Sequence, residues 1–175
     1  MKTLFVVLLG TAAVCALAKD AEYVSPEMPR ILSTELSGSD LVFFAGAARQ
    51  TALLVRLSEM AKGRAATPEV QALAAAAWKE QTDAAARLKD LAGRKEVPLP
   101  EEPDGPAKDL VQALAILKGF KFDKSCLDAL ADAQDQLGTA LEAGAASTDR
   151  DIKAFAAAEA GTLKVERERV RKLGL

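Results

Sequence analysis

The sequence predicts an all-α protein folded as a four-helix bundle. Half of its 175 residues are hydrophobic but only 5% are aromatic, a composition typical of helices that pack through alanine and leucine. Four long segments place apolar residues at alternating steps of four and three, which puts a seam on one face of a helix. Glycine, proline and capping residues separate these segments. A chain of this length fits one domain with a sizeable core.

Residues 1–18 have the pattern of a secretory signal peptide. Lys2 precedes an apolar run, and Ala16 and Ala18 occupy the small-residue positions before a cleavage site. The run is short for a membrane span, so we expect cleavage after Ala18 and no membrane span in the mature chain. Lipid attachment at Cys15 is a minor alternative.

Residues 19–36 should form an N-terminal tether, because they contain two prolines and show no sustained hydrophobic period. The bundle domain is then expected over residues 37–175. If Cys15 leaves with the leader, Cys126 is the only thiol and no intramolecular disulfide can form. Its leucine neighbours favour a buried, inert Cys126 over a reactive or intermolecular one.

The first two long helices should form an antiparallel hairpin. The first begins near Ser39 or Asp40 and ends at Gly63. The second runs from Thr67, whose hydroxyl can accept hydrogen bonds from first-turn amides, to Gly93, which suits a left-handed C-terminal cap. The short connection makes the chain fold back. The predicted seams are Phe43, Ala47, Gln50, Leu54, Leu57 and Ala61, and then Val70, Ala74, Ala77, Gln81, Ala84, Leu88 and Leu91.

A long connection follows. Four prolines fall between Pro98 and Pro106, and a short amphipathic helix is predicted over residues 108–118.

The last two long helices should form a second hairpin. The third opens at Phe122 with Asp123 as its cap and closes at Gly144, and Thr148 or Asp149 caps the fourth. Their seams are Leu127, Leu130, Gln134, Leu137 and Leu141, and then Ile152, Ala156, Glu159, Leu163, Glu166, Val170 and Leu173. Arg167, Arg169, Arg171 and Lys172 are expected on a solvated face that complements the helix dipole.

Two hairpins joined by one long connection have the single-crossover layout of ferritin-like folds. The predicted fold is therefore an all-α, ferritin-like four-helix bundle whose long crossover contains a short extra helix.

Five polar residues occupy seam positions that an ordinary bundle would fill with apolar side chains: Gln50, Gln81, Gln134, Glu159 and Glu166. The main hypothesis is a hydrogen-bonded polar core layer that fixes helix register. An alternative makes Glu159 and Glu166 oxygen ligands of a hard cation, aided by the glutamines at 81 and 134. A third is that helical phase drift turns some of these glutamates towards solvent.

The composition excludes several kinds of site. The formal net charge is −2, so no nucleic-acid partner is expected. The chain has no histidine and two cysteines, which removes the commonest general base and any zinc site. It also lacks a Ser-His-Asp or Cys-His set and a phosphate-binding glycine loop. We therefore expect no catalytic residues, no cofactor and no enzymatic activity.

The order and spacing of several segments resemble a family of exported bacterial ferritin-like proteins that is catalogued as domain of unknown function 4142. The segments are FFAGAA (43–48), VQALAAAAWKEQTDAAARLKDLA (70–92) with VPLP (97–100), GFKFD (119–123) and IKAFAAAEAGTL (152–163). The resemblance covers roughly residues 39–173 and implies a location in the periplasm or outside the cell.

This chain departs from the family pattern at its histidines. The family's histidine positions correspond to Gln81, Gln134 and Glu166, and its Leu-Pro pair to Ala160 and Gly161. Any metal or proton chemistry of those imidazoles therefore does not transfer. We expect a non-enzymatic structural or interaction module of the bacterial cell envelope, with an unknown protein partner and an undefined oligomeric state. The alternative is a divergent ferritin-like protein that binds metal through carboxylates alone.

Overall fold

The computed structural model describes residues 36–173, which form five helices and no strand. They are α1 (Gly38–Arg64), α2 (Pro68–Arg94), α3 (Gly105–Ala115), α4 (Gly119–Ala145) and α5 (Arg150–Lys172). The predicted all-α class is thus confirmed. The predicted leader, with Cys15 and the cleavage positions Ala16 and Ala18, lies outside the described residues, as does almost all of the tether.

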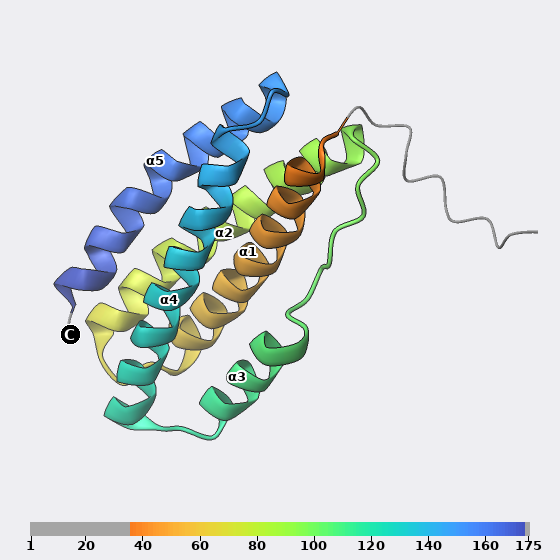
Figure 1. The fold of residues 1–175 in the computed structure, drawn as a ribbon. Coiled ribbons are helices and arrows are strands. Elements are labelled where there is room, and N and C mark those ends of the chain that lie inside the picture. Colours follow the sequence, from red (N-terminus) through yellow and green to blue (C-terminus); the bar gives the residue numbers. More distant parts are fainter. Residues whose placement is uncertain (1–35, 174–175) are drawn as a thin grey trace, which may run out of the picture. The chain divides into compact units, whose positions relative to one another are not determined.

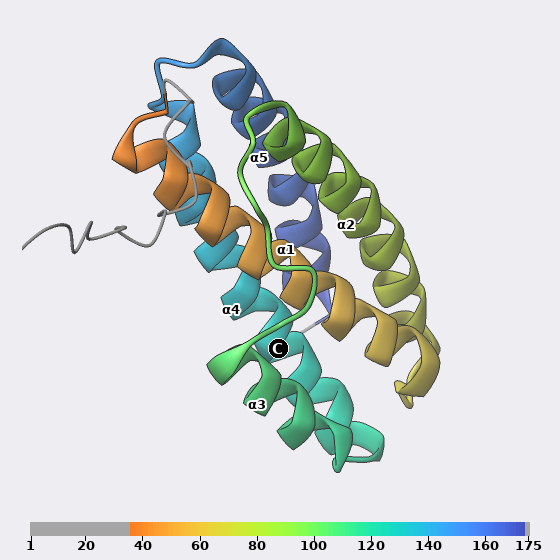
Figure 2. The same cartoon turned by 90° about the vertical axis from the view of Figure 1, so that its right-hand side faces the viewer.

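The four long helices form one bundle in which each helix packs against two others. α1 lies between α2 and α4, and α5 packs against α4 and α2 (Figures 1 and 2). Residues 65–67 and 146–149 are short turns, so α1 with α2 and α4 with α5 make antiparallel hairpins. The connection from α2 to α4 runs along the bundle and contains α3 (Figure 1). The predicted crossover with one short helix is therefore present.

The predicted seams form the core. Every seam residue named above is buried except Leu173, which is partly buried against the core. α1 also buries Phe44, Leu53 and Met60, because α2, α4 and the crossover cover most of its circumference. By length and composition alone, α1 is apolar enough to cross a membrane, but a mostly buried core helix has the same character.

The start of α1 is tied to the turn between α4 and α5. Ser37, rather than Ser39 or Asp40, caps α1, and its amide donates to the Asp40 carboxylate at 2.8 Å in a capping box. The Ser147 hydroxyl donates to the other Asp40 oxygen at 2.5 Å. Burial alone would raise the pKa of Asp40, but these hydrogen bonds from the two serines outweigh it and lower that pKa.

Asp123 does not cap its own helix as predicted, because α4 already begins at Gly119. Its buried carboxylate accepts from the Ala66 amide at 2.8 Å and from the Thr67 amide and hydroxyl at 3.0 Å. The predicted capping bond of Thr67 is wrong as well. Its hydroxyl donates to Asp123 and makes no capping hydrogen bond to α2. The turn between α1 and α2 is therefore held from α4.

The predicted C-terminal ends of three long helices are also wrong. α1 continues past Gly63 to Arg64, and the short helix of the crossover spans Gly105–Ala115 rather than residues 108–118. α2 continues past Gly93 to Arg94, and the left-handed residue after it is Glu96, with φ of 56°. α4 continues past Gly144 to Ala145. Gly144 instead allows α1 to approach α4, because a Cβ there would lie 2.6 Å from the Phe43 ring. The glycine serves packing rather than termination.

We expect Asp123→Ala to lower the free energy of unfolding by about 2 to 4 kcal/mol, because it leaves three donors of the α1–α2 turn without their acceptor. Urea unfolding followed by circular dichroism measures the change. Asp128→Ala is the matched control on the same helix, since Asp128 forms only an exposed pair with Lys124 at 3.6 Å. Equal losses in the two variants would contradict the role assigned to Asp123.

Candidate functional site

The candidate site is the polar layer inside the bundle. Its five members lie on four different helices, and none is more than 8% exposed. The structure brings Gln81 and Glu166 together and gives three other residues separate surroundings. The hypothesis that some of these glutamates face solvent therefore does not describe this structure.

Gln81 and Glu166 form the centre of the layer. The Gln81 amide donates to the Glu166 carboxyl at 2.6 Å, which joins α2 to α5. Beside them, Arg169 of α5 donates to both oxygens of Glu80 on α2, at 2.9 and 3.2 Å. Burial and the nearby Glu80 carboxyl raise the pKa of Glu166 to about 8, although the Gln81 hydrogen bond and the Arg169 charge act in the opposite direction. Glu166 is thus mostly protonated at neutral pH.

Glu159 pairs with an arginine. Arg87 of α2 donates through two nitrogens to one Glu159 oxygen, at 3.0 and 2.7 Å. The cation hypothesis needs this carboxylate, which the guanidinium already occupies. Within residues 36–173 no group of three or more acidic, cysteine or histidine side chains is arranged to hold a metal ion.

The polar bonds between α2 and α5, together with one between their cap residues Lys95 and Asp149, form a ladder of four rungs: Lys95–Asp149, Arg87–Glu159, Gln81–Glu166 and Glu80–Arg169. Along the ladder, the residue numbers decrease on the α2 side as they increase on the α5 side, as antiparallel helices require. α2 and α5 are also the least closely packed of the four neighbouring pairs. We call these eight residues the α2–α5 ladder, and they join two helices that share little apolar contact.

The remaining two members of the layer lie on other interfaces. Gln50 of α1 donates to the Gln136 side chain of α4 at 2.9 Å. Gln134 accepts from Arg167 at 2.7 Å through its backbone carbonyl, and its side-chain oxygen has no hydrogen-bond partner among the described residues. The Arg167 guanidinium lies over Gly138, where a Cβ would come within 2.4 Å of it. A side chain at that position would displace the arginine.

The layer is not fully satisfied. Four of its buried side-chain oxygens have no hydrogen-bond partner in the part of the chain that is described: Oε1 of Gln50, Gln81, Gln134 and Glu166. All of them are acceptors while Glu166 is ionised. Protonation of Glu166 converts one of its oxygens into a donor, which is consistent with its raised pKa.

The sequence analysis missed the arginines that complete the layer. Arg87 is outside the α2 seam, and Arg167 and Arg169 were assigned to a solvated face, yet each has a specific partner on another helix. Arg167 and Arg169 lie within one helical turn of the seam residue Glu166, and that proximity is the signal that could have identified them. Arg87 lies further than one turn from Gln81, so the sequence carries no such signal for it.

Cys126 is buried on α4 and donates weakly to the Leu57 carbonyl at 3.7 Å. Burial raises its pKa to about 12. A thiol in this state is not a nucleophile at neutral pH.

A family model described as "Domain of unknown function (DUF4142)" matches residues 26–173. No curated protein and no solved structure matches the chain. The ferritin-like comparison and the export of the chain therefore stay predictions.

The raised pKa of Glu166 predicts how stability depends on pH. A carboxyl whose pKa rises from 4.5 to about 8 on folding binds more protons in the folded state between these values. Its contribution to the free energy of unfolding is complete below pH 4.5 and is lost as the pH rises to about 8. Because Glu166→Gln cannot ionise, we expect wild type to lose on the order of 2 kcal/mol more than this variant between about pH 5 and pH 8.

Urea unfolding at a series of pH values measures this difference. Glu168→Gln changes an exposed carboxylate on the same helix and should keep the wild-type slope. Parallel stability curves for wild type and Glu166→Gln would show that Glu166 has an ordinary pKa.

Proposed function

The chain belongs to the family described as domain of unknown function DUF4142, and we propose that it is a non-enzymatic structural or interaction module of the bacterial cell envelope. The family description names no activity, so the proposal rests on the residues of this chain. Export follows from the signal-peptide pattern of residues 1–18.

The chemistry of the polar layer supports a structural role. Glu159 is bound by Arg87, Glu166 by Gln81, and Gln50 by Gln136, so these polar side chains engage one another across helices. Buried polar contacts of this kind fix the register of packed helices. Cys126, the thiol of the bundle, is held in its unreactive form by burial.

The observation that carries the interaction role is an exposed apolar pair at the corner between α3 and α4. Ile116 is 79% exposed and Phe120 is 77% exposed; Ile116 directly follows α3, and Phe120 is the second residue of α4. Phe120 also lines a hollow of about 240 Å³ between the start of α2 and the start of α4. A large aromatic side chain beside a hollow is the kind of anchor that dominates protein interfaces. We define Ile116 and Phe120 as the corner pair.

The proposal predicts a protein contact at the corner pair. A photoreactive amino acid placed at position 120 in the native envelope should crosslink one predominant envelope protein, identified by mass spectrometry. Ile116→Ser should reduce that product, because it removes half of the apolar contact. The control is the same photoreactive amino acid at Val165, which is 48% exposed on α5. A product pattern at position 120 that matches the pattern at 165 would contradict the interaction role.

A further inference from the structure

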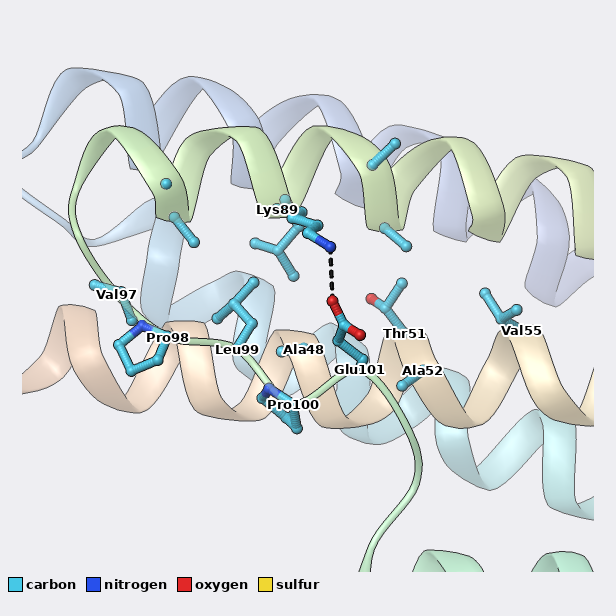
Figure 3. Close-up of a pocket in the computed structure, with 15 residues that line it drawn as sticks. Ala48, Thr51, Ala52, Val55, Lys89, Val97, Pro98, Leu99, Pro100 and Glu101 are labelled. Atoms are coloured by element: carbon cyan, nitrogen blue, oxygen red, sulfur yellow. Dashed lines mark hydrogen bonds and ion pairs between the residues drawn. The ribbon is translucent and has the colours of Figure 1, made fainter.

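A cavity of about 580 Å³ lies between α1, α2 and the segment that follows α2, far from the corner pair in sequence (Figure 3). Its volume falls within the range of about 300 to 1,000 Å³ that is usual for small-molecule sites. We call the segment of residues 97–101, VPLPE, the proline strap, because it forms the third wall of this cavity.

The walls of the cavity are mostly apolar. Alanines face it from both helices, among them Ala48 and Ala52 on α1 and Ala85 on α2, and their short side chains leave the space open. The strap is anchored at its start, where the Val97 amide donates to the Ala92 carbonyl at 2.9 Å, and Val97 packs against the core. Only three lining residues, Thr51, Lys89 and Glu101, carry polar side chains. A matching ligand is therefore mostly apolar with one polar end.

Thr51 is the polar group inside the cavity. It is only 4% exposed, and its hydroxyl makes no hydrogen bond within the described part of the chain. Figure 3 shows its side chain rising from α1 towards α2, into the space that the cavity occupies. A hydroxyl that makes no hydrogen bond to the protein and lines the cavity is free to bond a ligand group or water there.

Lys89 and Glu101 form an ion pair from α2 to the strap. The Lys89 ammonium donates to the Glu101 carboxylate at 2.7 Å (Figure 3). Both side chains are largely exposed, at 73% and 75%, so the pair adds little to stability and can exchange partners. Lys89 is fixed to a helix, whereas Glu101 belongs to the strap and stays solvated when it is released.

We propose that this cavity binds an acyl chain that ends in a carboxylate, of the class of medium-chain fatty acids. The chain fills the space between the alanines and the strap, and its burial supplies the main driving force. The carboxylate replaces Glu101 as the partner of Lys89, and Thr51 offers a second donor on the inner wall. A cationic head group is disfavoured, because Lys89, the charged residue that a helix carries at this site, would repel it.

Titration calorimetry of the purified protein with decanoate as the probe tests the proposal. We expect one equivalent to bind, and decylamine to bind about tenfold more weakly because it repels Lys89. Lys89→Met should weaken decanoate binding by about tenfold, the effect of losing one charged hydrogen bond at a partly exposed site. Lys79→Met is the matched control, because Lys79 pairs with Asp83 on the same helix outside the cavity, and it should bind as wild type does.

A second variant tests the position of the acyl chain. Ala52→Phe fills the cavity and should abolish decanoate binding while the circular dichroism spectrum stays helical. Should that variant fail to fold, Lys89→Met and its control still decide the question, since both change exposed side chains. No binding of decanoate to wild type would overturn the proposal, and so would equal binding of decylamine or unchanged binding by Lys89→Met.

Discussion

The structure depends on the hydrogen bond from Gln81 to Glu166, which joins α2 and α5 at the middle of the bundle. Among the four long helices, these two share less contact than any other neighbouring pair, so apolar burial alone holds them weakly. The α2–α5 ladder supplies polar bonds along the same line, with the Arg87–Glu159 pair towards one end and the Glu80–Arg169 pair towards the other. The interface between α2 and α5 is therefore held in part by polar side chains.

A buried carboxyl at this point has a chemical consequence. The resemblance to the family implies that Glu166, Gln81 and Gln134 stand at positions where relatives carry histidine. All three are buried here, and burial together with the Glu80 carboxyl favours the protonated form of Glu166. The group that titrates is thus a glutamic acid with a pKa of about 8, in a site without imidazole.

The sequence was sufficient to predict the helices, the crossover and the buried faces, because hydrophobic periodicity reports directly which side of a helix meets the core. It was not sufficient for the helix ends. The local pattern predicted that Asp123 caps its own helix. Its partners Ala66 and Thr67 instead lie in the turn between α1 and α2, and a local sequence pattern does not report such a long-range contact. The same limit applies to the site, where the glutamines and glutamates could be identified from their seam positions but their arginine partners could not.

The central claim is that the middle rung of the α2–α5 ladder is a coupled pair. A double-mutant cycle with Gln81→Leu, Glu166→Leu and the double variant tests it most directly, with the free energy of unfolding measured in urea at neutral pH. Each single change leaves the other polar group without its partner. The loss in the free energy of unfolding of the double variant should therefore be smaller than the sum of the two single losses, by at least about 1 kcal/mol. Losses that add within about 0.3 kcal/mol would show that the two side chains act independently, and would contradict the account.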